Sequence, residues 1–226
     1  MRGIFHLHTR HSFDSMTSPA KIVDVAIKNK LDLLLIADHD TLAGSIEAKE
    51  IAREKNPNLQ VPIAGEFFTD VGDIIVADVP VDFAPSFDHK DLCKRAKKAG
   101  GFTVLPHPLD GHHLEKIDFT CIDCIEIFNS RSRPEHDVLS KELAQRHQKP
   151  VIYGADAHFS QDLLNCLFEW EGPLLSPSFM KPIRLVKTPS YRKSLSQAIK
   201  GIKQKDPALF ARSLIRALKK ASSSSH

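Results

Sequence analysis

Short apolar runs along this chain are repeatedly followed, within a few residues, by side chains that bind metals. These side chains are His6, His8, Asp38, His39, Asp40, Glu66, His107, Asp156 and His158. Short apolar runs of this kind are typical of buried strands. In a barrel of parallel strands, catalytic residues come from the carboxyl ends of several strands. The pattern therefore predicts a hydrolase site with several metal ions at the mouth of an α/β barrel.

The seven runs predict seven strands, over residues 3–7, 33–37, 61–65, 73–78, 102–106, 123–128 and 151–155. Helical patterns separate several of them, one opening at Ser18-Pro19 and others over residues 41–55, 88–99 and 134–148. Strands that alternate with helices indicate a mainly parallel sheet. The third and fourth strands are too close for a crossover helix, so they form either a hairpin or one bent strand.

The last part of the chain has a different pattern. Several prolines over residues 172–190 predict an extended wrap, and residues 190–203 and 206–221 have the apolar spacing of helices. We therefore expect a catalytic barrel over residues 1–160. Residues 161–226 are expected to form a wrap and basic helices that pack on the same domain.

Positive charge is concentrated at the carboxyl end of the sequence. Residues 181–226 hold twelve of the 31 Lys and Arg but only one of the 28 acidic residues. Such a segment is either an arm that contacts nucleic acid or a solvated helix face on an acidic body. No run approaches the roughly 18–20 apolar residues of a membrane span. We expect no signal peptide, no membrane contact and a cytoplasmic location.

The spacing of the metal-binding side chains is specific. In His6-Leu7-His8 the two imidazoles lie on the same side of an extended strand, where one metal ion can bind both. Asp156 and His158 repeat this spacing with an oxygen and a nitrogen ligand. Each motif alone is a weak signal. Their joint occurrence at successive strand ends indicates one shared site.

Five short elements follow one another in a fixed order. They are His6-x-His8 with Asp14, Asp38-His39-Asp40, Gly65-Glu66, Leu105-Pro106-His107-Pro108, and Gly154-Ala155-Asp156-Ala157-His158. This ordered set resembles the PHP (polymerase and histidinol phosphatase) family over about residues 1–160. The resemblance implies a distorted seven-stranded (β/α)7 TIM-like barrel, here with a basic helical extension. It also implies two to three divalent metal ions (Mn, Fe or Zn) and hydrolysis of phosphate esters.

Position by position, the resemblance also implies the ligands of three metal ions. The first ion would be held by His6, His8, Glu66 and Asp156. Glu66 would bridge to a second ion held also by His107, and the third would be held by Asp14, His39 and His158. Many family members have a histidine after the bridging glutamate, whereas this chain has Asp73, whose carboxylate also binds such metals.

The predicted reaction is attack of a metal-activated hydroxide on a small phosphorylated metabolite or nucleotide. Arg131 and Arg133 follow the sixth strand, where a guanidinium suits phosphate, and Asn129 and Arg10 are further substrate-binding candidates. Arg131 and Asp40 are the candidate catalytic residues. The group that protonates the leaving group stays open among Asp40, His11, His112 and His113, and Glu126 faces either the site or the neighbouring layer.

Three alternatives use the same residues. A nuclease would hold nucleic acid with residues 181–226. An amidohydrolase also begins with His-x-His in a barrel, but no bridging lysine is evident at a strand end. A binding module would keep the barrel and metals without turnover, although the nearly complete ligand set argues against it.

Overall fold

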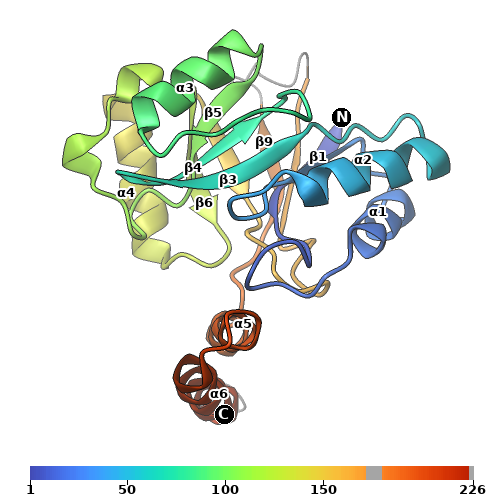
Figure 1. The fold of residues 1–226 in the computed structure, drawn as a ribbon, viewed down its shortest axis with the longest axis vertical. Coiled ribbons are helices and arrows are strands. Elements are labelled where there is room, and N and C mark those ends of the chain that lie inside the picture. Colours follow the sequence, from blue (N-terminus) through green and yellow to red (C-terminus); the bar gives the residue numbers. More distant parts are fainter. Residues whose placement is uncertain (172–179, 224–226) are drawn as a thin grey trace.

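The computed structural model describes residues 1–171 and 180–223 and places their strands in two sheets (Figure 1). One sheet has the strand order β2-β1-β8-β9, and the other has the order β3-β4-β5-β6-β7. The first sheet contains β1 (Arg2–Leu7), β2 (Leu33–Ile36), β8 (Cys166–Glu169) and β9 (Lys181–Leu185). The second contains β3 (Ala64–Thr69), β4 (Gly72–Ala77), β5 (Phe102–Leu105), β6 (Cys124–Asn129) and β7 (Val151–Gly154).

Six α-helices connect or follow these strands. They are α1 (Pro19–Lys28), α2 (Ala43–Lys55), α3 (His89–Lys98), α4 (Pro134–Arg146), α5 (Ser190–Lys203) and α6 (Pro207–Ser223). The first begins as its sequence predicts, because Ser18 accepts a hydrogen bond from the backbone N–H of Lys21. None of the helices that the structure describes combines the length and apolar sequence needed to cross a membrane.

The prediction of a closed seven-stranded barrel is wrong, because the strands of the described residues form two separate sheets. Only Asp70 and Val71 separate β3 from β4, which therefore pair as an antiparallel hairpin; a parallel crossover needs about a dozen residues. In addition, β8 pairs antiparallel with the start of β1. It occupies the edge of β1 only at Arg2 and Gly3, and further along this edge β1 is hydrogen-bonded to Ala155 and Ala157, just after β7.

The two sheets pack face to face around a shared apolar core. Phe5 of β1 and Phe168 of β8 belong to the same buried cluster as Ile75 of β4 and Val104 of β5. The helices cover the outer faces, with α1 and α2 over the first sheet and α3 and α4 over the second (Figure 1). This arrangement fixes the strand ends that carry the predicted ligands.

At one end of the molecule the two sheets also touch through backbone bridges. Leu7 bridges to Ala157, just after β7, and His39, just after β2, bridges to Glu66 in β3. These bridges lie at the carboxyl ends of β1 and β2. The same end brings together the predicted metal-binding residues.

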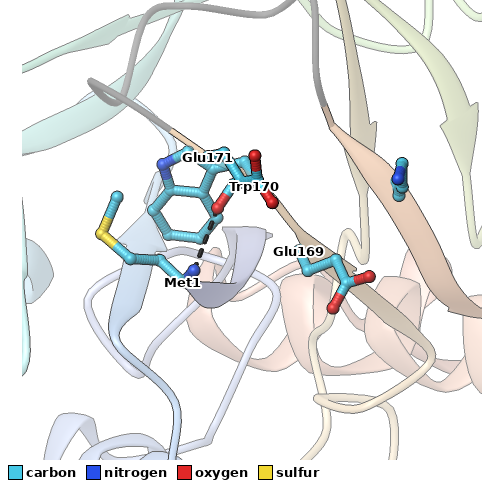
Figure 2. Close-up of a pocket in the computed structure, with 5 residues that line it drawn as sticks. Met1, Glu169, Trp170 and Glu171 are labelled. Atoms are coloured by element: carbon cyan, nitrogen blue, oxygen red, sulfur yellow. Dashed lines mark hydrogen bonds between the residues drawn. The ribbon is translucent and has the colours of Figure 1, made fainter.

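The opposite end of β1 holds a small pocket without any predicted site residue. Its volume is about 170 Å³, and its lining residues are Met1, Glu169, Trp170, Glu171 and Lys181. The amino group of Met1 donates a hydrogen bond of 2.9 Å to the carbonyl oxygen of Trp170 (Figure 2). This bond joins the first residue to the end of β8, away from the carboxyl end of β1.

The carboxyl-terminal part of the described chain contains a strand and two helices. The range 172–190 lies partly outside the described residues, and within the rest Lys181–Leu185 form β9 beside β8. α5 and α6 then form a helical hairpin that projects from the body (Figure 1). The two helices approach closely at Gly201, where an added Cβ would lie 2.6 Å from the backbone nitrogen of Phe210.

One lysine of α5 fastens this hairpin to the loop after β1. The Nζ atom of Lys203 donates hydrogen bonds to the carbonyl oxygens of Arg10, Ser12 and Ser15 at 2.6–2.7 Å. The Nζ atom of Lys200 lies 4.4 Å from the ring centroid of Phe13 in the same loop. The loop that carries Asp14 is therefore held from outside by α5.

Removal of the Lys203 ammonium group is expected to weaken this attachment. In Lys203→Met the free energy of unfolding should fall by about 1 kcal/mol, since charge-assisted bonds to three carbonyls are lost at a largely exposed site. Chemical denaturation monitored by circular dichroism measures the change. Lys205→Met, which removes an exposed lysine two residues later, is the control; an equal effect in both variants would contradict the anchoring role.

Candidate metal centre

Eight of the nine predicted ligands fall into three groups, and within each group the ligand atoms lie within 4.8 Å of one another. The groups are His8, Asp14, His39 and His158; His6, Glu66 and His107; and His6, His8 and Asp156. They share His6 and His8, so the three groups form one continuous polar cluster. Nearly all of its members are buried.

Several of these residues have an unusual backbone conformation. His6, His107 and Asp156 have positive φ angles of 64°, 29° and 45°. Such conformations cost non-glycine residues about 1–3 kcal/mol each and persist where the surroundings impose them. At His6 the pairing of β1 with β2 shifts register, as at a β-bulge, which re-aims a side chain. The rings of His6 and His8 thereby face the same cluster, with centroids 5.1 Å apart.

Glu66 is the centre of the cluster. Its fully buried carboxylate lies 3.0 Å from Nε2 of His107 and 3.3 Å from Nε2 of His6. Nδ1 of His39 is 3.2 Å away. Burial alone would raise the pKa of Glu66, but the charges on His6 and His39 and the hydrogen bond from His107 hold it well below its usual range.

The imidazoles around Glu66 respond to the same charge. The pKa of His39 and that of His107 are each raised to about 9; burial opposes this, but the adjacent carboxylate of Glu66 outweighs it. Protons and metal ions compete for the same nitrogen lone pairs. The nitrogens of His39 and His107 that face Glu66 are thus the atoms that a metal ion would bind.

The group around Asp14 is built from three different parts of the chain. Nε2 of His158 lies 2.8 Å from Oδ2 of Asp14, and Nε2 of His39 lies 3.7 Å from the same oxygen. Ser12 orients the carboxylate by donating a hydrogen bond of 3.1 Å to its other oxygen. The ring of Phe13 stacks on His39 at 4.5 Å, and this contact shields the group from one side.

The donor set fits borderline divalent metal ions. Nε2 of His8 is fully buried and has no hydrogen-bond partner among the described residues, although carboxylate oxygens of Asp156 and Glu66 lie 3.4 Å and 3.5 Å away. Burial and the nearby His158 lower the pKa of His8 to about 3, so its ring is neutral, which is the form that binds metals. Mixed imidazole and carboxylate ligands suit Mn, Fe or Zn.

Glu126 completes the cluster, and the sequence alone did not assign it a role. It is buried in β6, and its Oε1 lies 3.0 Å from Nδ1 of His6. Its Oε2 accepts hydrogen bonds from the backbone N–H of His107 at 2.7 Å and from the amide of Asn129 at 2.8 Å. A carboxylate that binds the second nitrogen of a ligand histidine fixes the orientation of its ring. Glu126 therefore positions two ligands.

The side chain of Glu126 packs directly against the backbone of β7, so no larger residue than glycine fits at position 154. A Cβ atom added to Gly154 of β7 would lie 1.6 Å from Oε1 of Glu126. Asn129, predicted to bind substrate, is buried instead, and its Oδ1 accepts hydrogen bonds from the backbone of Arg131 and Ser132. Its amide group thus shapes the loop after β6.

The Asp38-His39-Asp40 run divides among three roles. Only His39 belongs to the ligand groups. Asp38 turns to the loop after β1, where its two oxygens accept hydrogen bonds from the backbone N–H and the hydroxyl of Thr9 at 2.5 Å and 2.6 Å. Asp40, the predicted catalytic acid, is exposed and accepts a hydrogen bond of 3.0 Å from the backbone N–H of Phe68.

Asp73 lies beside the cluster but outside the three groups. Burial, followed by the negative charge of Glu66, raises its pKa to about 6. Nε2 of His112 donates a hydrogen bond of 2.8 Å to the backbone oxygen of Asp73, and the His112 ring lies 5.5 Å from that of His107. Asp73, which stands where many members of the PHP family have a histidine, therefore lies next to the cluster.

The predicted arginines are placed differently from one another. Arg131 faces the cluster, with its Nε 3.9 Å from Oδ2 of Asp156. Arg133 is exposed, and together with Arg131 and Asp156 it lines a cavity next to the cluster. Arg10 instead pairs with Glu47 at 2.8 Å, and His11 lies 2.7 Å from the other oxygen of that glutamate. The side chains of Arg10 and His11 thus contact α2 rather than the cluster.

Comparison with known proteins finds distant sequence relatives and solved structures with a similar fold. No protein-family model matches the chain. The uncharacterized protein MJ1587 of Methanocaldococcus jannaschii is 28% identical over 168 residues, which cover 66% of this chain and 95% of that protein.

Several solved structures have a similar fold, among them the following two. One is a two-domain protein of Bacteroides vulgatus that contains a predicted PHP-like metal-dependent phosphoesterase. Its TM-score is 0.55 at 20% identity, over 70% of this chain and 52% of that chain, so this chain spans about half of that protein. The other is an amidohydrolase of Chromobacterium violaceum with bound sulfate and no metal. Its TM-score is 0.55 at 16% identity, over 69% of this chain and 87% of that chain.

The positioning role of Glu126 predicts a loss of metal affinity in Glu126→Gln. The affinity should fall about 10- to 100-fold, because the amide cannot replace both charged contacts to His6 and His107. Calorimetric titration of Mn or Zn into chelator-treated protein measures it. Glu115→Gln, at an exposed acid of a 3-10 helix, serves as the control. Unchanged affinity in Glu126→Gln would show that the carboxylate does not position the ligands.

Proposed function

We propose that this chain is a metal-dependent phosphoesterase of the PHP type that hydrolyses the phosphate ester of a small metabolite or nucleotide. The observation that carries the proposal is the sharing of His6 and His8 among three ligand groups, with the guanidinium of Arg131 beside Asp156. Ions bound within overlapping groups would lie close together, and phosphoesterases use such clusters. The fold likeness to a PHP-like phosphoesterase supports the same class.

The cluster residues would hold the ions in the groups described above. Bound divalent ions supply Lewis acidity, which lowers the pKa of water and neutralises charge on phosphoryl oxygens. The protein itself contributes rigidity, because Glu126 and Ser12 fix the directions of His6 and Asp14. Buried side chains surround the cluster on the strand side, which leaves access from the cavity next to Asp156.

Arg131 is the substrate-binding residue that the geometry supports best. One of its terminal nitrogens donates a hydrogen bond of 2.7 Å to Oγ of Ser196 in α5, which fixes the guanidinium next to Asp156. Its remaining N–H groups are suited to two oxygens of one phosphoryl group. Arg131 would thus orient the substrate and balance its charge. Asp40 retains its proposed role as a proton donor only if a substrate reaches over the exposed edge of β3.

An amidohydrolase is the second candidate, since the fold likeness to the Chromobacterium violaceum amidohydrolase is equally strong. The charge of Arg131 distinguishes the two candidates. A cation beside the ligand groups suits a phosphate anion, whereas a neutral amide has no use for it. A panel of amide and cyclic imide substrates tests this alternative directly.

A role in binding nucleic acid through residues 181–226 is weakened by the contacts of that segment. Lys187 pairs with Asp137 at 2.5 Å, Arg192 pairs with Asp162, and Lys203 binds backbone carbonyls. These cations are directed to the body of the protein. They favour a segment that belongs to the enzyme over an arm that reaches for a polyanion.

The proposal predicts metal-dependent hydrolysis of a generic phosphate ester such as p-nitrophenyl phosphate. Chelator treatment should abolish the activity, and Mn, Fe or Zn should restore it. His8→Ala and Asp156→Ala should each lower the rate about 100-fold or more, since each residue belongs to a shared ligand group. Colorimetric rates and metal analysis of each variant measure these effects.

Lys90→Gln, at an exposed lysine outside the ligand groups, should keep wild-type activity. Thermal melting of each variant shows whether it is folded. Undiminished hydrolysis by metal-stripped protein, or by a folded His8→Ala variant, would contradict the proposal.

A further inference from the structure

The cavity beside the cluster is lined by two parts of the chain that are far apart in sequence. Its volume is about 330 Å³. The loops after β5 and β6 contribute most of its wall, and α5 contributes Lys193. The lining residues are His107, Asp110, Arg131, Ser132, Arg133, Asp156 and Lys193. α5 is therefore a wall of the cavity that opens onto the proposed metal centre.

The charges of this cavity do not balance. Of its two acids, Asp156 belongs to a ligand group, and Asp110 is bound by the hydroxyl of Ser132 and by Nδ1 of His136 at 2.9 Å. Within residues 1–171 and 180–223, Lys193 forms no ion pair. Three cationic side chains thus face a cavity whose acids already have other partners.

The position of Lys193 is imposed by its neighbours on α5. Arg192 is paired with Asp162, and Ser196 accepts the hydrogen bond from Arg131. Half-burial of Lys193, and secondly the positive charge of Arg131, lower its pKa, while the charges of Asp110 and Asp156 oppose this shift. Two like charges in a half-buried wall repel each other, and an anion bound between them would stabilise both. The fold holds them there because contacts on both sides of Lys193 fix the helix.

We propose that Arg131 and Lys193 form a subsite for a dianionic phosphate group, so that α5 completes the substrate pocket. The inference rests on the proposed phosphoesterase function and specifies its substrate class. Two converging cations match the two negative charges of a phosphate monoester better than the single charge of a phosphodiester. Arg133 at the rim is available to the rest of the substrate.

Phosphate binding by the chelator-treated protein tests the subsite without any reaction. The probes are inorganic phosphate at about pH 8, where it is mainly dianionic, and dimethyl phosphate, which carries one charge. Calorimetry or phosphorus NMR titration measures both affinities. Wild-type protein should bind inorganic phosphate more tightly than dimethyl phosphate.

Lys193→Gln should weaken inorganic phosphate binding about tenfold, as expected for one lost charge-assisted contact, and should affect dimethyl phosphate less. Lys193→Arg should restore the affinity, and the matched control Lys205→Gln should leave it unchanged. Equal phosphate affinity in wild type and folded Lys193→Gln would overturn the subsite, as would equal affinity of wild type for the two probes.

The kinetics of the metal-loaded protein separate this inference from the proposed function. If both are right, Lys193→Gln raises KM for a phosphate monoester more than it lowers kcat. Hydrolysis with an unchanged KM in Lys193→Gln would overturn the subsite and leave the phosphoesterase intact. Phosphate binding that depends on Lys193, in a protein that hydrolyses no phosphate ester with any metal, would support the subsite and refute the function.

Discussion

Glu66 carries a negative charge with no access to solvent, and the cluster at the carboxyl ends of the strands depends on how that charge is balanced. Burial of an unpaired carboxylate costs several kcal/mol. Here imidazoles from the end of β1, the end of β2 and the end of β5 surround it. The same residues tie the two sheets together at the His39–Glu66 bridge. Loss of Glu66 would therefore leave several buried imidazoles without a counter-charge and would loosen the contact between the sheets.

Much of this cluster could be anticipated because strand ends are easy to read from sequence. Apolar runs locate the strands, and parallel neighbours bring their carboxyl ends to one edge. The division of the strands into two sheets could not be predicted from the apolar runs. Their periodicity does not show that β8 pairs antiparallel with the start of β1. Glu126 was ambiguous for a related reason. An acid within an apolar strand can face either layer, and only the pairing of β6 with β7 shows that it faces His6.

The basic carboxyl-terminal segment makes contacts that its charge count does not reveal. From the sequence, twelve cations within 46 residues are compatible with an arm for a polyanion. In the structure, Lys187, Arg192 and Lys203 contact the body, whereas Lys193 turns into the cavity. Within α5, Arg192 and Lys203 anchor the hairpin to the body, and Lys193 lines the cavity. α5 lies outside residues 1–160, which carry the family resemblance, and yet its Lys193 lines the cavity next to the cluster.

The most direct test of the central claim is crystallographic. Crystals of the protein loaded with Mn or Zn, measured at the absorption edge of the metal, locate each ion by anomalous scattering. Strong anomalous density among His6, His8, Glu66 and Asp156, with further density beside Asp14, His39 and His158, is the predicted result. Density confined to surface histidines such as His113, with none inside the cluster, would show that the buried residues balance one another's charge without holding metal.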